Sequence, residues 1–222
     1  MLCSYAMSEL IGDDIKAVLF DHDDTLVGTI EAKWAAHKHV AKTHYNKELL
    51  DEEIRQHWGK PLSTLVGLLY ETNDIDTALK REMATHPDFP KRLFESTIGV
   101  LERIRQLGKF VGLVTATSRR SFVYDLDTLG IPLALFDYTH TEDDAVFHKP
   151  DSRVFEPAKQ WLAQHDIVAE EAMYVGDGLH DKRAAEDAGF NFVGVATGLV
   201  TVEEFRKAGA KAVASLEDLL PK

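Results

Sequence analysis

Closely spaced carboxylates are the residues of this 222-residue chain with the clearest chemical potential. Asp21 and Asp23 follow the short apolar run Ala17–Phe20, and Asp177 follows the run Ala172–Val175. Two buried carboxylates this close repel each other when both are ionised, so one gains a raised pKa or a cation neutralises them. No Cys/His ligand spacing accompanies them, and oxygen ligands favour Mg²⁺ over zinc. The sequence therefore predicts a Mg²⁺ site.

A hydroxyl group and an ammonium group are expected at the same place. Thr115 ends the predicted strand Phe110–Thr115, and Lys149 stands just before Pro150 in a loop that enters a helix. Open parallel sheets bind ligands at the carboxyl ends of their strands, so these side chains should converge with the carboxylates. A metal ion and a lysine around a carboxylate offset the repulsion between anions, as attack on a phosphoryl group requires.

The elements that position these residues alternate between strand and helix. Short apolar runs that end in polar loops predict buried strands at Ala17–Phe20, Phe110–Thr115, Leu135–Tyr138, Ala172–Val175 and Phe192–Val195. The last helices are predicted at Asp151–Gln164, after Asp177 up to Gly189, at Val202–Lys207 and at Leu216–Leu220. This alternation predicts the α/β class, with a doubly wound parallel sheet covered by helices on both faces.

The sequence between the first and second strands has a different character. It contains four helical segments with few β-branched runs, at Glu31–Tyr45, Asp51–Trp58, Leu62–Tyr70 and Asp74–Thr85. We therefore predict two domains. Residues 1–28 and 96–222 form an α/β core, and residues 29–95 form an inserted all-α helical cap.

Composition narrows the class of partner and the compartment. The chain carries 37 acidic and 25 basic residues, a net charge of −12, which disfavours nucleic acid or an anionic membrane as the main partner. Its single cysteine, Cys3, excludes an intramolecular disulfide and fits a reducing compartment. The first 14 residues do not resemble a signal peptide, and no apolar run approaches the roughly 20 residues of a membrane span. We therefore expect a cytoplasmic protein. Met7 is an alternative start of translation, and the oligomeric state is left open.

Four motifs, in this order along the chain, resemble those of the haloacid dehalogenase-like hydrolase superfamily. The resemblance is to its phosphoglycolate phosphatase and β-phosphoglucomutase branch, which has a Rossmann-like core and a helical cap. The sequences that carry it are Phe20-Asp21-His22-Asp23-Asp24-Thr25-Leu26, Thr115 at the end of a strand, Lys149-Pro150, and Gly176-Asp177-Gly178-Leu179-His180-Asp181.

The resemblance implies a role for each matching residue. Asp21 is expected to be the nucleophile, and Asp23 to protonate the leaving oxygen and then activate water. Asp21, the backbone carbonyl of Asp23 and Asp177 are expected to bind Mg²⁺. The other implied contacts are a hydrogen bond from Thr115 to the phosphoryl group, pairing of Lys149 with that group and the nucleophile, and support by Asp181 for Lys149 or a metal-bound water.

Two positions depart from the pattern of this family. Asp24 stands where glycine is common, and Ala116 stands where an asparagine often follows the threonine of the second motif. The first change concerns the turn after Asp23, and the second concerns a phosphate or substrate contact. The roles of His22 and His180 are left open.

A loop in the predicted cap is a candidate for substrate selection. Gly59-Lys60-Pro61-Leu62 occupies the position from which helical caps of this branch reach the substrate. Lys60 is therefore a candidate for recognising an anionic or hydroxylated substrate. A plain surface turn between helices explains the same residues equally well.

The expected function is Mg²⁺-dependent hydrolysis of a small phosphorylated metabolite through an aspartyl-phosphate intermediate. A β-phosphoglucomutase-type phosphomutase is the first alternative, and Leu62, where such mutases carry arginine, weighs against it. Asp23 argues against a dehalogenase, because a departing halide needs no proton. A phosphonate hydrolase that forms an imine on Lys60 is a remote alternative. A non-catalytic phosphate-ligand binding protein on the same fold is disfavoured, since such descendants usually lose Asp21 or Asp23.

Overall fold

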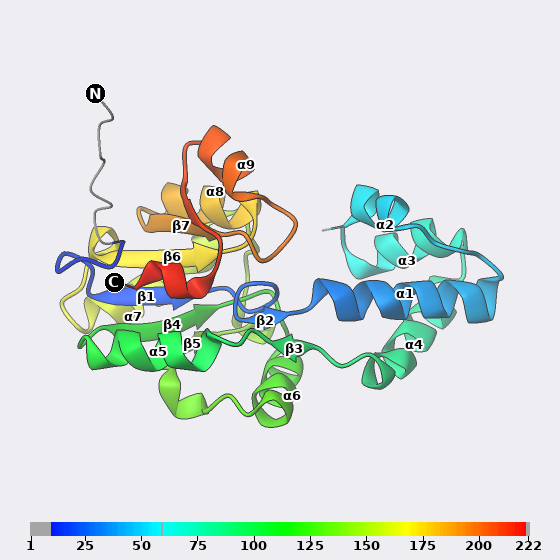
Figure 1. Ribbon diagram of the computed structural model, residues 1–222, viewed down its shortest axis with the longest axis horizontal. Helices are drawn as coiled ribbons and strands as arrows, with labels where there is room; N and C mark the ends of the chain where they lie inside the picture. The colour runs from blue at the N-terminus through cyan, green and yellow to red at the C-terminus, as the bar shows by residue number, and fades with distance from the viewer. Residues whose placement is uncertain (1–9, 59, 221–222) are drawn as a thin grey trace. The chain divides into compact units, whose positions relative to one another are not determined.

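The computed structural model describes residues 10–58 and 60–220 (Figure 1). Cys3, Met7 and Gly59 lie outside the described residues. The chain divides into two compact units, an α/β unit of Met1–Gly28 with Leu93–Lys222 and a helical unit of Thr29–Arg92. Between them the chain passes through β2 (Val27–Gly28) and β3 (Arg92–Leu93), which pair as a two-stranded sheet.

A six-stranded sheet runs through the described part of the α/β unit. Its strands, in spatial order, are β5 (Tyr138–His140), β4 (Phe110–Val114), β1 (Ala17–Phe20), β6 (Ala172–Gly176), β7 (Asn191–Val195) and β8 (Lys211–Val213). All neighbouring strands are parallel, and Phe20 of β1 lies opposite Leu113 of β4 and Val175 of β6. The carboxyl ends of these three strands therefore lie side by side, and the predicted fold class is confirmed.

Helices cover both faces of this sheet (Figure 1). Every residue of β1 is buried, with Val18 and Phe20 in one apolar core and Ala17 and Leu19 in the other, because successive side chains point to opposite faces. The first core is covered by α5 (Thr97–Gln106) and α6 (Arg119–Leu129), and the second by α7 (Glu156–Ala163), α8 (Leu179–Asp187) and α9 (Val202–Lys207). A strand covered on both sides must be apolar throughout, which explains the run that precedes Asp21.

The described helices of the helical unit are α1 (Ile30–Tyr45), α2 (Asp51–His57), α3 (Leu62–Tyr70) and α4 (Ile75–Thr85). A buried polar network joins three of them. Nδ1 of His37 in α1 lies 2.8 Å from the hydroxyl of Tyr70 in α3, and that hydroxyl donates to Glu82 in α4. All three side chains are buried, so directional bonds help to fix the helices of this unit against one another.

The predictions from the sequence were wrong for several short elements of the α/β unit. Leu133–Leu135 forms a 3-10 turn after Pro132, and β5 begins only at Tyr138. Ser152–Phe155 and Leu216–Leu219 are also 3-10 turns, where α-helix was predicted. The edge strand β8 was missed, because three residues that begin with a lysine form no apolar run. Within the described ranges, no helix is both long and apolar enough to cross a lipid bilayer.

Candidate active site at the carboxyl end of the sheet

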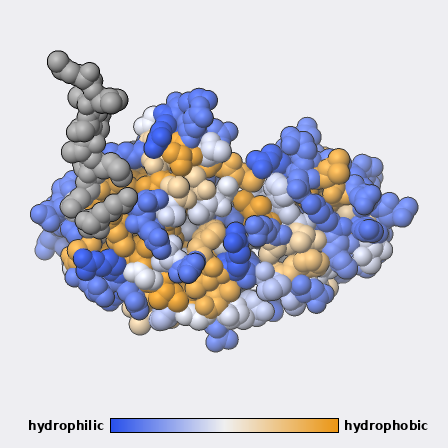
Figure 2. Space-filling view, in the orientation of Figure 1, coloured by the Kyte–Doolittle hydropathy of each residue, from blue (hydrophilic) through white to orange (hydrophobic). Residues whose placement is uncertain are grey.

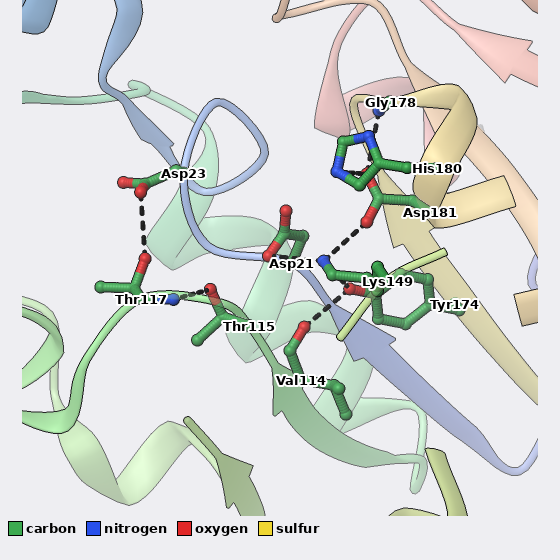
Figure 3. A network of polar contacts seen from close by, with 10 residues as sticks. All are labelled: Asp21, Asp23, Val114, Thr115, Thr117, Lys149, Tyr174, Gly178, His180 and Asp181. Carbon is green, nitrogen blue, oxygen red and sulfur yellow. Dashed lines mark hydrogen bonds and ion pairs between the residues drawn. The ribbon is translucent and has the colours of Figure 1, made fainter. Parts of the chain in front are cut away.

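Asp21 is held at the end of β1 by a main-chain bond to the neighbouring strand. Its amide donates to the carbonyl of Val175 in β6 at 2.9 Å, and the residue is 7% exposed. The chain then turns sharply, and the carbonyl of His22 accepts the amide of Leu26 at 2.9 Å. This turn keeps both Asp21 and Asp23 at the carboxyl end of the sheet (Figure 3).

Lys149 reaches three oxygen atoms with a side chain that is only 4% exposed. Its ammonium lies 3.1 Å from Oδ1 of Asp21 and donates to Oδ1 of Asp181 at 2.6 Å (Figure 3). It also donates at 2.9 Å to the hydroxyl of Tyr174, which itself donates to the carbonyl of Val114 at 2.7 Å. The lysine is therefore anchored to β1, β4, β6 and α8 together.

Asp181 combines a helix-capping role with its contact to the lysine. It lies in the first turn of α8, where its Oδ2 accepts the amide of Gly178 at 3.0 Å. A Cβ atom on Gly176 would come within 2.6 Å of Cγ of Asp181, so only glycine leaves room for this carboxylate. The spacing of the fourth motif thus places one oxygen on the helix terminus and the other on Lys149.

Burial and nearby charges shift the pKa values of this group in different directions. Burial raises the pKa of Asp21, and the positive charge of Lys149 offsets this only in part. Burial, together with the negative charges of Asp181 and Asp21, raises the pKa of Asp177 well above its ordinary value. Burial lowers the pKa of Lys149, but the carboxylates of Asp181 and Asp21 outweigh it and hold the pKa well above its ordinary range. The lysine therefore remains charged beside Asp21, whose ionised form burial disfavours.

Thr115 and Asp23 are linked through a residue that the sequence did not single out. The hydroxyl of Thr117 donates to Oδ2 of Asp23 at 3.0 Å, and the amide of Thr117 donates to the hydroxyl oxygen of Thr115 at 3.1 Å (Figure 3). Because the Thr115 oxygen accepts this bond, its own O–H remains available to donate to a ligand. The loop between β4 and α6 thus connects two of the predicted site residues.

The acidic side chains form two groups that could each offer ligand atoms to a cation. Among the described residues, Asp21, His180 and Asp181 bring ligand atoms to within 4.8 Å of one another, and so do His22, Asp23 and Asp125. The side chains of Asp21, Asp23 and Asp177, predicted to bind Mg²⁺, are not gathered within that distance. The ligand predicted from Asp23 is its backbone carbonyl, however, and not its side chain. The negative charges of Asp181 and Asp21 are close enough to raise the pKa of Asp177. Buried oxygen donors with raised pKa values suit a hard divalent cation.

The departure at Asp24 has a backbone explanation. Asp24 has a φ angle of 56°, which lies in the left-handed region. Glycine adopts this conformation freely, and aspartate is one of the few other residues that tolerate it. The carbonyl of Asp24 also accepts a bond from the hydroxyl of Thr197 at 2.5 Å, which holds the turn in place. The backbone at this position therefore requires a positive φ angle. Aspartate adopts it here, in place of the glycine that is common in the family.

Replacement of Asp24 by alanine is expected to destabilise the protein by about 1 kcal/mol relative to replacement by glycine. Both substitutions remove the same buried carboxylate, so their difference isolates the backbone conformation. Chemical denaturation of the two variants measures this difference. Equal unfolding free energies would show that the left-handed conformation carries no cost for alanine at this position.

Sequence analysis did not identify three residues that make contacts in the site. Thr117 stands two residues after the predicted Thr115, and a search for hydroxyl groups near that strand end would have found it. Tyr174 appears as one more apolar residue of a buried strand. Oδ2 of Asp125 lies 2.9 Å from Nε2 of His22. Asp125 could have been found from the sequence, because it is a carboxylate on the apolar face that α6 forms with Phe122. Lys60 is exposed in the helical unit, and its role stays a prediction.

Comparison with known proteins identifies the family of this chain. The profile of the haloacid dehalogenase-like hydrolase family matches residues 18–195. Pyrophosphatase PpaX of Bacillus velezensis is 30% identical over 185 residues, which are 82% of this chain and 83% of that protein. The structure of CbbY from Rhodobacter sphaeroides in complex with phosphate superposes with a TM-score of 0.73 at 22% identity, over 92% of this chain and 96% of that one. An HAD hydrolase of Entamoeba histolytica superposes with a TM-score of 0.76 at 16% identity, over 92% and 95%. The chain therefore belongs to the haloacid dehalogenase-like hydrolase family.

Proposed function

We propose that this protein is a Mg²⁺-dependent phosphatase that hydrolyses a small phosphorylated metabolite through a phosphoryl group carried on Asp21. The observation that supports this most is the Lys149 ammonium, buried and 3.1 Å from the Asp21 carboxylate at the end of the central strand. A carboxylate can attack an anionic phosphate only where fixed positive charge offsets their repulsion. Membership of a hydrolase family supports the same reaction class.

The proposed reaction has two steps. In the first, an oxygen of the Asp21 carboxylate attacks phosphorus while the bond to the leaving oxygen breaks, and Asp23 gives that oxygen a proton. In the second, water attacks the phosphorus of the aspartyl phosphate, Asp23 takes a proton from the water, and inorganic phosphate leaves. Lys149 balances the charge of the phosphoryl oxygens, and the O–H of Thr115 donates to one of them.

The buried carboxylates fit the Mg²⁺ that the family implies. Asp21, the backbone carbonyl of Asp23 and Asp177 would hold the ion, and Asp181 would keep Lys149 in place. When bound, Mg²⁺ supplies positive charge that polarises the phosphoryl oxygens and neutralises the neighbouring carboxylates. Burial and neighbouring negative charge raise the pKa of Asp177, and a divalent cation bound there would favour its ionised form.

The experiment that tests the proposal is phosphate release from a panel of phosphorylated metabolites, with Mg²⁺ and without it. We expect at least one small phosphate monoester to reach a kcat/KM on the order of 10⁴ M⁻¹s⁻¹ or higher. The panel includes phosphate esters of sugars, short organic acids and nucleosides, together with a phosphopeptide that should be a poor substrate. Failure to release phosphate from any of them in the presence of Mg²⁺ would refute the proposal.

Inorganic pyrophosphate is a second candidate substrate, because the relative at 30% identity is named as a pyrophosphatase. The same nucleophile and lysine serve either reaction, and the difference lies in the leaving group. A phosphate leaving group needs less help from Asp23 than an alcohol does, since phosphate is a much weaker base. A kcat/KM for pyrophosphate above that of every monoester would assign this second activity.

Replacement of Lys60 by alanine is expected to lower kcat/KM for the best substrate about tenfold, the effect of losing one charged hydrogen bond. Activity toward a small generic phosphate ester should change little, because such an ester has no distal group for the lysine to bind. The matched control is Lys80→Ala, which removes another exposed lysine of the same unit. Equal losses for the two substrates would identify the loop around Lys60 as a plain turn.

A further inference from the structure

His22 lies between the proposed nucleophile and the proposed acid–base residue, and its side chain is fully buried beneath helix α6. Nε2 of His22 is 2.9 Å from Oδ2 of Asp125, a residue 103 positions further along the chain. The imidazole also meets the ring of Phe122 edge to face, with the ring centres 5.4 Å apart. Asp125 is 4% exposed, so the pair is shielded from water.

Packing alone gives no physical reason for this pair. Nδ1 of His22 has no hydrogen-bond partner among the described residues. Burying this polar nitrogen therefore lowers the stability of the folded state. Two apolar side chains of similar volume would often be as stable or more stable at such a position. The hydrogen bond between His22 and Asp125 does, however, fix a direction, which apolar contacts do not.

Helix α6 holds the loop after β1 at a second point. Thr117 immediately precedes Ser118, the N-cap residue of this helix, and its hydroxyl donates to Oδ2 of Asp23 at 3.0 Å. The helix therefore reaches residue 22 through Asp125 and residue 23 through the loop at its N-terminus. The bond from Thr117 thus helps to fix the orientation of the Asp23 carboxyl group.

The main chain of His22 is also the anchor of the turn. Its carbonyl accepts the amides of Leu26 at 2.9 Å and Val27 at 3.1 Å. A displacement of the His22 side chain thus shifts the peptide on which Asp23 is carried. A shift of this kind changes the direction of the carboxyl group while leaving the acid itself in place.

We propose that His22 and Asp125 are positioning residues that, together with Thr117, aim the carboxyl group of Asp23 at the leaving oxygen. This rests on the proposed phosphatase function. The pair holds the loop that carries Asp23, and it also lies close to that side chain, because ligand atoms of His22, Asp23 and Asp125 are within 4.8 Å of one another. The pair sets how well Asp23 transfers its proton, and it leaves the nucleophile Asp21 and its contact with Lys149 unchanged.

The consequence is measurable as a dependence on the leaving group. An alkyl phosphate needs a proton on its leaving oxygen, whereas p-nitrophenyl phosphate releases a stable phenolate without one. We expect Asp125→Leu and the double variant His22→Leu with Asp125→Leu to lower kcat/KM for an alkyl phosphate about tenfold or more. For p-nitrophenyl phosphate the loss of kcat/KM should stay below about threefold, because kcat/KM reports the first step and excludes the later attack of water, which is common to both substrates.

Three variants separate positioning from damage to the fold. The double variant removes both polar groups, so it leaves no unpaired buried charge that would unfold the protein. His22→Gln keeps an N–H group near the place of Nε2 and should recover most of the alkyl phosphatase activity. Asp127→Leu makes the same change at an exposed site of the same helix and should leave both activities unchanged. Thermal unfolding of each variant establishes that it is folded at the assay temperature.

Two results would overturn the positioning role. One is an equal loss of kcat/KM toward alkyl and aryl phosphates in folded variants. The other is a double variant that hydrolyses the alkyl phosphate as fast as the wild-type protein, since the pair would then serve packing alone. A wild-type protein that hydrolyses neither substrate would instead refute the phosphatase function itself.

Discussion

Asp21→Asn is expected to reduce phosphate release about a thousandfold or more, to the background of the assay. An amide nitrogen or oxygen is a poor nucleophile, and it cannot form the acyl phosphate through which the reaction is proposed to pass. Asp181 cannot substitute for it, because its two oxygens accept from the Gly178 amide and from Lys149. The measurement is kcat for the best substrate of the metabolite panel.

The fold should survive this substitution. Burial raises the pKa of Asp21, so the folded state disfavours its ionised form and gains little from the charge. Lys149 keeps its bonds to Asp181 and Tyr174. Thermal unfolding within a few degrees of the wild-type protein serves as the control. In an acid-quenched single turnover, the wild-type chain should carry a phosphoryl group and the variant should not. More than a few per cent of residual turnover would remove Asp21 from its proposed role.

Removal of divalent cations is expected to lower activity by a factor of about a hundred or more. The buried carboxylates would repel both one another and the incoming phosphate, and Lys149 alone supplies too little positive charge to compensate. Mg²⁺ should restore full activity. Ca²⁺ should inhibit, because its larger and looser coordination shell misplaces the phosphate relative to Asp21.

Binding can be measured separately from activity. Isothermal titration of Mg²⁺ into the metal-free protein should give one site, and Asp177→Asn should weaken that binding strongly. Asp127→Asn, an exposed change of the same kind, should leave it unchanged. Full activity in the presence of a strong chelator would exclude a metal from the reaction.

The parts of the site that lie at strand ends could be predicted from the sequence. Asp21, Thr115 and Asp177 each follow an apolar run, and parallel strands bring such ends together whatever the details of packing. Residues whose importance depends on a distant partner could not be predicted. Tyr174 fits a buried strand equally well with or without its hydroxyl, and its bond to Lys149 exists only in three dimensions.

The same distinction explains the errors in the fold. The central strand Ala17–Phe20 is buried on both faces, so its composition alone defines it. The edge strands β5 and β8 are short and partly exposed. Each pairs with a single neighbouring strand, and the local sequence does not specify that neighbour. The backbone of Asp24 was unpredictable for another reason, since aspartate occurs in many conformations and only glycine would have indicated positive φ.

The pairing of β2 with β3 brings together the two points where the chain enters and leaves the helical unit. An insertion whose ends are adjacent costs its host little, because the entropy of closing a loop grows only with the logarithm of its length. The α/β unit can therefore accept inserts of different size and sequence at this junction without rebuilding its sheet. Grafting a helical unit from another family member between Gly28 and Leu93 is a direct route to chimeric enzymes that keep one reaction centre and acquire a new substrate range.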